Sequence, residues 1–427
     1  MTSNSAGPLS GVVVVDLTQH LAGPFATQIL GDLGARVVKV EPLTGDTTRL
    51  IAPYFVAGES DYYVSANRNK ECVAVNLKDP EGRQLLLDLA SKADVVVENF
   101  KPGTMARLGL AYEDFKAAND QIVMCSISGF GQVGGYRDAP AFDMVVQALA
   151  GVMSITGEAD GHAVRAGVPI GDITAGLYGA IGVLGGLVQR YVSGEGSYID
   201  VAMYDGQLSL LSYLAAYYLL AGEIPGPQGR AHRSTVTYRV YACGDGTEIV
   251  VTATTEAQFR RLCTALDLDD WAAQERFRGN GARLQRRAEV DGVIEAAFAR
   301  LDSESALRRL HEHTVPCGTI RGVNQALDDP HTRARDMVMT LTGQDDGQRA
   351  DVVGNPVKFL GYTEPRQFPA RIGEHTTAVL GEMLGLDPGK VRLLADSGIV
   401  GLDAGPHPAS PPVPEQAATL AAQQAEG

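Results

Sequence analysis

The residue best placed to do chemistry is Asp172, in the stretch RAGVPIGDITAG (165–176). Two glycines and a proline precede this acid, and the segment LYGAIGVLGGL that follows carries no charge. Glycine permits positive φ and the close approach of a ligand, and a carboxylate stripped of water becomes a stronger nucleophile. The same acid could instead cap a helix that begins near Ile173. From the residues alone, both interpretations stay open.

Asp143, in PAFDMVVQ, presents a similar choice. Here a helix cap or a buried hydrogen-bonding group is the favoured interpretation.

Motifs for other chemistries are missing from the sequence. The loop TQHLAGPFATQ after the first apolar run has one glycine where a dinucleotide site needs GxGxxG. There is no GxxxxGK[ST] phosphate loop, no HExxH and no GxSxG elbow. The sequence therefore predicts no metal site and no nicotinamide or flavin cofactor.

Composition narrows the class of protein. The chain has 36 basic and 51 acidic residues and a net charge of −15, which argues against a nucleic-acid partner. The five cysteines are scattered without CxxC, as in a protein with reduced thiols. The N-terminus lacks a secretory signal pattern. The apolar stretches 173–188 and 206–222 are shorter than the roughly 20 residues of a membrane span. We expect a cytoplasmic protein with no membrane partner.

Apolar runs alternate with helix-length segments in the first third of the chain. This order predicts an α/β fold with a doubly wound parallel sheet. The predicted strands are 12–17, 35–41, 71–77, 93–100 and 121–127. Ligands of such sheets bind beyond the carboxyl ends of the strands, here TQHLAG, NLKDP, NFKPG and SGFGQ. Glycines 176, 179 and 182 recur every three residues, as in a helix packed closely against another backbone.

Breaks in this pattern suggest a division of the chain. Residues 1–220 are predicted to form most of a large α/β domain, and 221–335 a linker and a smaller α+β domain. Residues 336–400 are expected to return to the large domain. The Pro- and Ala-rich tail 401–427 is predicted to be disordered.

Taken over most of its length, the sequence resembles the family III CoA-transferases, a family that also contains formyl-CoA transferase and the α-methylacyl-CoA racemases. The resemblance covers most of the chain, and the order and spacing of its pieces make it more specific than any single motif. The matching pieces are LSGVVVVDLTQHLAGPFATQILGDLGARVVKVE, GDTTR, NLKDPEGRQLLLDLASKADVVVENFKPGTMARLGL, SISGFGQVGGYRDAPAFDMVVQALAGVMSITGE, GVPIGDITAGLYGAIGVLGGL, SYIDVAMYD and DDPHTRARDMV.

The resemblance implies an acyl-CoA:carboxylate CoA-transferase. The nucleophile of the family's GxPxxD element falls on Asp172, which would form an aspartyl anhydride and then an aspartyl-CoA thioester. Coenzyme A enters as a thioester substrate, so no tightly bound cofactor is expected. The implied partners are an acyl-CoA, a carboxylic acid and a second copy of the chain, in a homodimer of two interlocked rings.

The resemblance also implies where coenzyme A binds. Lys78 and Arg107 are suited to its anionic phosphates, and SGFG (128–131) is expected to line the thioester end. The full predicted set is His20, Leu21, Ala22, Val75, Asn76, Leu77, Lys78, Asn99, Phe100, Lys101, Arg107, Ser128, Gly129, Phe130 and Gly131.

Two alternative functions are compatible with the same fold. In the 2-methylacyl-CoA racemase branch, a His–Asp–x–Asn–Tyr pattern falls on residues 142–146, where this chain reads FDMVV. Phe142 cannot carry a proton, which favours transfer over racemisation. An inactive CoA-binding scaffold is disfavoured by the intact Asp172.

Substrate choice is less constrained. Leu21 and Ile51 stand where formyl-CoA transferases that use oxalate carry Gln and Trp, and their glycine run is reduced here to CGDG (243–246). Formyl-CoA and oxalate are therefore disfavoured. Arg165, Arg233 and Arg239 are candidates to pair with the far carboxylate of a dicarboxylic acceptor.

Overall fold

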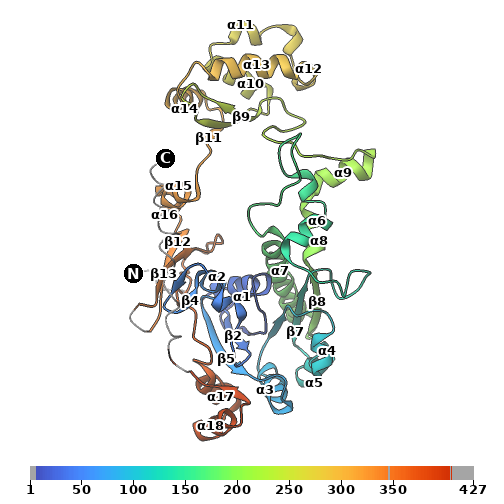
Figure 1. Cartoon of the computed structure of the whole chain (residues 1–427), viewed down its shortest axis with the longest axis vertical. Helices are drawn as coiled ribbons and strands as arrows, with labels where there is room; N and C mark the ends of the chain where they lie inside the picture. The colour runs from blue at the N-terminus through green and yellow to red at the C-terminus, as the bar shows by residue number, and fades with distance from the viewer. Residues whose placement is uncertain (1–5, 345–346, 404, 406–427) are drawn as a thin grey trace. The chain divides into compact units, whose positions relative to one another are not determined.

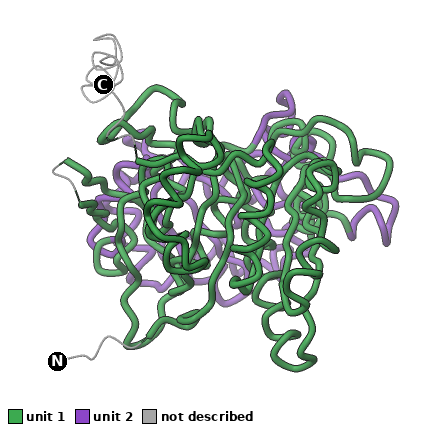
Figure 2. Tube along the Cα trace, turned by 90° about the horizontal axis from the view of Figure 1, so that it is seen from below, with its two compact units in different colours: residues 1–152, 166–215, 333–427 green, residues 153–165, 216–332 purple. Residues whose placement is uncertain are grey.

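The computed structural model describes residues 6–344, 347–403 and 405 (Figure 1). The chain divides into two compact units, coloured separately in Figure 2. The first consists of Met1–Val152, Ala166–Ala215 and Arg333–Gly427, and the second of Met153–Arg165 and Ala216–Thr332. The division expected from the sequence differs in three places: it ends the first long segment at residue 220 instead of 215, keeps 153–165 within the large domain, and begins the return segment at 336 instead of 333.

A seven-stranded sheet forms the centre of the first unit, in the order β14-β5-β2-β1-β6-β7-β8. Every neighbouring pair is parallel except β14 with β5, which is antiparallel. The strands are β1 (Val13–Asp16), β2 (Arg36–Glu41), β5 (Lys70–Val75), β6 (Val95–Glu98), β7 (Val123–Ser128), β8 (Ser197–Ala202) and β14 (Val400–Gly401). The predicted α/β class with a large, mostly parallel sheet is confirmed, and β8 and β14 extend the sheet beyond the strands predicted from the sequence.

Helices cover both faces of this sheet. The β-branched side chains of the central strands are buried on the two faces, as in a sheet with helices on both sides. One face packs against α1 (Ala22–Asp32) and α7 (Ile170–Ser193). The other packs against α3 (Pro80–Ala90), α5 (Tyr112–Ala118), α17 (Thr376–Leu384) and α18 (Pro388–Asp396).

The glycine stripe of α7 allows the close packing that the sequence predicts. A Cβ on Gly176 would lie 2.7 Å from the carbonyl oxygen of Ala22, and one on Gly179 would lie 2.7 Å from Cδ1 of Ile127. The helix spans 24 residues, more than the sequence suggested, and by length and composition alone it could cross a membrane. In this fold it is the crossover between β7 and β8 and packs against α1 and the sheet.

Shorter elements complete the first unit. They are η1 (Thr47–Leu50), β3 (Phe55–Val56), β4 (Glu59–Ser60), α2 (Asp61–Ala66), α4 (Thr104–Leu108), α6 (Asp143–Leu149), α8 (Met203–Leu210), α16 (Pro330–Ala334), β12 (Val338–Thr342) and β13 (Arg349–Val353). Of these, α16 begins in the second unit and ends in the first. One further helix, α9 (Ser212–Ala221), begins in the first unit and ends in the second.

The second unit is built on a three-stranded antiparallel sheet, β11-β10-β9, with helices around one hydrophobic core. Its elements are η2 (Met153–Ile155), β9 (Tyr238–Ala242), β10 (Glu248–Thr252), α10 (Glu256–Ala265), α11 (Asp269–Ala272), η3 (Glu275–Phe277), α12 (Asn280–Gln285), α13 (Arg287–Phe298), α14 (Ser303–Glu312), β11 (Cys317–Thr319) and α15 (Val323–Asp328). The tail predicted to be disordered, 401–427, falls outside the described residues apart from 401–403 and 405.

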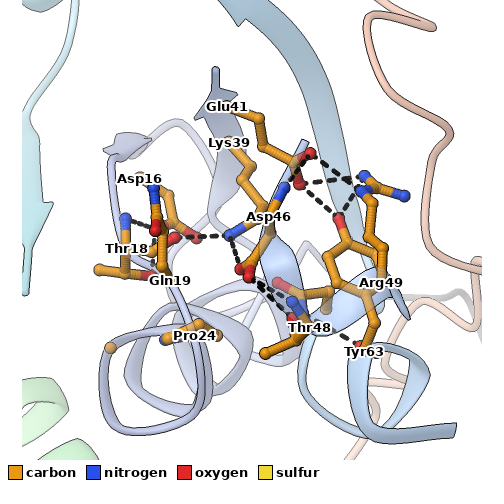
Figure 3. Close-up of polar contacts among 12 residues, drawn as sticks. Asp16, Thr18, Gln19, Pro24, Lys39, Glu41, Asp46, Thr48, Arg49 and Tyr63 are labelled. Atoms are coloured by element: carbon orange, nitrogen blue, oxygen red, sulfur yellow. Dashed lines mark hydrogen bonds and ion pairs between the residues drawn. The ribbon is translucent and has the colours of Figure 1, made fainter. Parts of the chain in front are cut away.

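A buried polar network lies beside the carboxyl ends of β1 and β2 (Figure 3). Lys39 donates to the carbonyl oxygen of Thr18 at 2.6 Å and pairs with Asp46 at 3.4 Å. Burial alone would lower the pKa of Lys39, but nearby carboxylates, Asp16 first among them, raise it above its usual value. This cation therefore fixes the backbone of the loop that leaves β1.

Arg49 is the second centre of this network. It binds Glu41 through Nε at 2.9 Å, Glu59 at 2.6 Å and the Tyr63 hydroxyl at 2.6 Å, and it is almost completely buried. Removing it would leave two carboxylates buried without their cation, a costly arrangement.

We predict that Arg49→Met lowers the free energy of unfolding by about 3–5 kcal/mol, because Glu41 and Glu59 lose their buried partner. Urea unfolding followed by circular dichroism measures this. The matched control is Arg260→Met, at an exposed pair with Glu256, where the loss should stay below about 1 kcal/mol. Equal losses in the two variants would contradict a stabilising role for the network.

Candidate functional site

Asp172 lies in the first turn of α7. The helix begins at Ile170 with Pro169 at the N-cap, so the alternative in which Asp172 caps a helix from Ile173 is wrong. Asp143 is likewise the first residue of α6, behind Phe142 at the N-cap. Neither acid caps its own helix, and both are available for contacts elsewhere.

Asp143 and Gln147 hold the segment that leads to Asp172. The Asp143 carboxylate accepts the N–H of Gly171 at 2.7 Å through one oxygen and the Gln147 amide at 2.7 Å through the other. The Oε1 atom of Gln147 accepts the N–H of Ala166 at 2.8 Å. The hydrogen-bonding interpretation of Asp143 is therefore confirmed, and both ends of 166–171 are fixed by α6.

The packing of α7 on α1 decides which loop Asp172 adjoins. Gly176, which contacts Ala22 at the start of α1, lies one turn after Asp172 and so on the same face of α7. Helical side chains tilt toward the N-terminus of their helix, which carries Asp172 toward the loop before Ala22. Both helices begin at the carboxyl edge of the parallel sheet, where ligands of this architecture bind.

The environment of Asp172 favours its neutral form. Burial, and then the negative charge of Asp143, raise the pKa of Asp172 to about 7. The pKa of Tyr62, on α2, is raised to about 12 by burial and next by the charge of Asp172. Tyr62 is therefore a protonated phenol within electrostatic reach of the carboxylate. Nothing in its sequence context, SDYYVS, distinguished it from Tyr63 or from a surface tyrosine.

Two predicted binding loops are joined by Asn99. Its side chain accepts the N–H of Gln19 at 2.8 Å and donates to the carbonyl oxygen of Gln19 at 2.7 Å. The next residue, His20, is exposed and has a φ of 63°, while Leu21 and Ala22 are buried. The segments 20–22 and 99–101 therefore lie together at the ends of β1 and β6.

The predicted residues after β5 lie at the same edge of the sheet, two strands from β1. Val75 ends the strand, Leu77 packs on the core and Lys78 is exposed. The Asn76 side chain donates to the carbonyl oxygen of Gly398 at 3.3 Å. This amide thus connects the strand end to the returning C-terminal segment.

The cationic residues predicted to bind phosphate have their charged groups at the surface. Lys101 is exposed beyond β6, with Phe100 half-buried before it. Arg107, on α4, is exposed and donates to the Thr104 hydroxyl at 2.9 Å. Both are accessible to an anionic ligand at this edge of the sheet.

The predicted SGFG segment forms a tight turn after β7. The Ser128 hydroxyl accepts the N–H of Gly131 at 2.9 Å, and Gly131 has a φ of 86°. Phe130 packs against Tyr136 and Tyr204. A Cβ on Gly129 would lie 2.1 Å from that of Ala141, so this turn approaches the chain just before α6.

The three arginines proposed for a far carboxylate all lie in the second unit. Arg239 pairs with Asp291 at 2.6 Å and Glu295 at 2.8 Å, and Arg233 pairs with Glu223. Arg165 is exposed. Across residues 6–344, 347–403 and 405, no group of three or more His, Cys, Asp or Glu side chains is arranged to hold a metal ion.

Comparisons with known proteins identify the family of this chain. The family model described as CoA-transferase family III matches residues 9–376. The succinyl-CoA:glutarate CoA-transferase of Homo sapiens is 38% identical over 400 residues, which cover 93% of this chain and 91% of that protein. The succinyl-CoA:mesaconate CoA-transferase of Haloarcula marismortui is 35% identical over 402 residues, 91% of this chain and 100% of that protein. A crystal structure of a CAIB/BAIF family protein from Brucella suis matches with a TM-score of 0.78 at 34% identity, over 89% of this chain and 100% of that one.

The raised pKa of Asp172 predicts a pH-dependent stability. Because the folded-state pKa of about 7 exceeds the ordinary value of 3.8, the native state binds the proton more tightly than the unfolded chain. The stability this contributes is present below about pH 4 and is lost as pH rises through about 7. Relative to Asp172→Asn, the unfolding free energy of the wild type should fall by about 2 kcal/mol between about pH 5 and about pH 8, after allowance for partial exposure.

Urea unfolding of the two proteins across this pH range is the measurement. Asp205→Asn, at an exposed aspartate on α8, is the control and should follow the wild-type curve. Parallel curves for the wild type and Asp172→Asn would show that the carboxyl is not perturbed by its surroundings.

Proposed function

The chain belongs to CoA-transferase family III, and we propose that Asp172 is the nucleophile with which it moves coenzyme A from an acyl-CoA to a free carboxylic acid. One observation carries the proposal: this carboxylate stands in the first turn of α7, on the face that packs against the start of α1. It therefore adjoins the loop 20–22 at the carboxyl edge of the sheet, where a thioester can approach it.

The first half-reaction follows from carboxylate chemistry. An oxygen of Asp172 attacks the thioester carbonyl, the C–S bond breaks, and a mixed aspartyl anhydride and CoA thiolate form. The thiolate then attacks the aspartyl carbonyl and expels the donor as its carboxylate, which leaves an aspartyl-CoA thioester. No net proton is gained or lost, because a carboxylate enters and a carboxylate leaves.

The second half-reaction reverses these steps with another acid. The acceptor carboxylate attacks the aspartyl-CoA thioester and forms a new anhydride, and the thiolate attacks the acceptor's acyl carbon. The new acyl-CoA departs and the Asp172 carboxylate is restored. Each attack creates a tetrahedral oxyanion, which the Tyr62 hydroxyl is suited to stabilise.

The surroundings of Asp172 suit it to this work. Partial burial and the Asp143 charge raise its pKa to about 7, so its carboxylate is poorly solvated and more reactive than one in water. Asp143 holds the N–H of Gly171, and this fixes the backbone next to the reacting group. Lys78, Lys101 and Arg107 are exposed at the same edge of the sheet, where they can bind the phosphates of coenzyme A.

We propose short dicarboxylic acids as the substrates. The relatives described above are named for transfer from succinyl-CoA to glutarate or to mesaconate, and all three acids carry two carboxylates. Of the arginines considered for the second carboxylate, Arg165 is exposed, whereas Arg233 and Arg239 pair with acidic neighbours.

We also propose that the active form is a homodimer of interlocked rings. One face of α7 exposes apolar side chains in succession, and Tyr191 is 92% exposed. These residues are Leu177, Tyr178, Ile181, Val188, Tyr191 and Val192. Large exposed apolar patches mark interaction surfaces, and a second copy of the chain is the partner that the family resemblance implies.

We predict that Asp172→Asn and Asp172→Ala each lower kcat for CoA transfer at least about 1,000-fold, because neither side chain can form the anhydride. Succinyl-CoA with glutarate is the first pair to assay, and Asp205→Asn is the control. CoA binding, measured by calorimetry, should persist in both Asp172 variants. Retention of a tenth of the wild-type rate by Asp172→Ala would show that this carboxylate is not the nucleophile.

A parallel assay distinguishes transfer from racemisation. The wild type is incubated in deuterated water with a branched 2-methylacyl-CoA, with and without its free acid. Because the Phe142 side chain cannot act as a general base, the α-hydrogen should stay in place while coenzyme A moves between acyl groups. Deuterium at the α-carbon without transfer would assign the chain to racemisation instead.

The dimer is tested by light scattering. At micromolar concentration the wild type should show a mass near twice 45.2 kDa. The double variant Val188→Glu/Tyr191→Glu places charge on the exposed face of α7 and should weaken association. Leu393→Glu, at an apolar residue on α18 about as exposed as Val188, is the control and should leave the mass unchanged. A monomeric wild type would contradict the proposed assembly.

A further inference from the structure

Gln207 is a buried polar residue that the mechanism above leaves without a role. It lies on α8, its side chain is 0% exposed, and neither its amide nitrogen nor its amide oxygen has a hydrogen-bond partner among the described residues. Burying an amide with both groups unsatisfied costs free energy that a methionine of similar length would avoid. A residue that merely fills space would not need this amide.

The amide reaches the residue next to Asp172. A Cβ on Gly171 would lie 2.3 Å from the amide nitrogen of Gln207 and 2.9 Å from an oxygen of Asp143. The two polar groups therefore meet in the space that the missing side chain of Gly171 leaves open. The same Asp143 oxygen accepts the N–H of Gly171 at 2.7 Å.

The helix that carries Gln207 is firmly packed on α7. A Cβ on Gly206 would lie 3.1 Å from Cγ2 of Thr174, and the hydroxyls of Tyr178 and Ser209 are 2.8 Å apart. The position of the amide is thus set by the contact between α8 and α7. In such a buried place, the attraction between an amide dipole and a carboxylate is stronger than in water.

We propose that Gln207 is a positioning residue for the transfer reaction, an inference that rests on the function proposed above. The positive end of its amide attracts the Asp143 carboxylate across Gly171. This holds α6, α8 and the first turn of α7 in one arrangement, so the Asp172 carboxyl keeps its orientation while anhydride and thioester form and collapse. A small displacement of a reacting group can cost large factors in rate.

The test replaces the amide by an isosteric apolar group. Gln207→Met should keep or raise the urea midpoint and change KM for the acyl-CoA by no more than about threefold, whereas kcat should fall about 10- to 100-fold. The matched control is Gln28→Met, because Gln28 on α1 is also buried with an unpartnered Oε1 atom. Its kcat should match the wild type. A Gln207→Met enzyme with wild-type kcat would overturn the proposal and leave Gln207 as packing alone.

A second pair of variants separates the amide from its volume. In Gly171→Ala the new methyl group displaces the amide, and kcat should fall as in Gln207→Met. Gly171→Ala/Gln207→Ala relieves the closest contact of the methyl group, which is with the amide, without restoring an amide, so kcat should stay low. Recovery of kcat in the double variant would overturn the proposal. This result would be decisive even if Gln207→Met does not fold.

A failure of the Gln207 proposal can be distinguished from a failure of the proposed function. Mass spectrometry of the protein incubated with succinyl-CoA detects the aspartyl-CoA thioester directly. If Asp172 is not the nucleophile, the wild type forms no such ester. If only the role of Gln207 is mistaken, the ester forms in Gln207→Met at the wild-type rate.

Discussion

The close approach of α7 to the start of α1 is the constraint on which this site depends. Gly176 makes it possible, because any side chain there would collide with the carbonyl oxygen of Ala22. Glycine within a helix costs about 1 kcal/mol relative to alanine, and the packing of α7 on α1 and the sheet offsets that cost. The result is that two helix starts and the loop 20–22 share one edge of the sheet, with Asp172 among them.

Buried polar groups then fix the parts that packing brings together. Lys39 holds the carbonyl oxygen of Thr18, and Asn99 holds both backbone groups of Gln19. Asp143 performs the same task for the N–H of Gly171. The first two contacts hold the loop before α1 and the third holds the turn before Asp172, so the loop and the carboxylate keep a fixed relation.

This arrangement explains why an acid lies in the first turn of an apolar helix. The apolar residues and glycines of α7 pack this helix against the sheet and α1. The same packing limits the access of water to Asp172. Burial and Asp143 raise the pKa of Asp172 to about 7. A carboxylate in this state gains reactivity that a solvated aspartate lacks.

The sequence predicts the parallel sheet and marks Asp172 as a candidate for chemistry because both leave local signals, whereas the role of Asp172 as nucleophile is implied only by the family resemblance. Buried strands are runs of β-branched residues. In GVPIGD, two glycines and a proline, residues with special backbone conformations, come before one acid. Other features depend on contacts between distant residues. Gly157 accepts a hydrogen bond from Gly229, which ties 153–165 to the second unit, and β14 has only two residues, too few for a periodic pattern. Gln207 stands in the apolar run GQLSLLSYLAAYYLLAG, where nothing marks its amide as a neighbour of Gly171.

Isotope labelling of Asp172 tests the central claim most directly. The enzyme is turned over with succinyl-CoA and glutarate labelled with ¹⁸O in both carboxylates, and the peptide that contains Asp172 is then analysed by tandem mass spectrometry. If the acceptor attacks the aspartyl-CoA thioester and the thiolate then takes the acyl group, one acceptor oxygen remains on Asp172 after each turnover. The account predicts ¹⁸O in the Asp172 side chain and in no other residue of that peptide. Transfer of coenzyme A without label at Asp172 would contradict it.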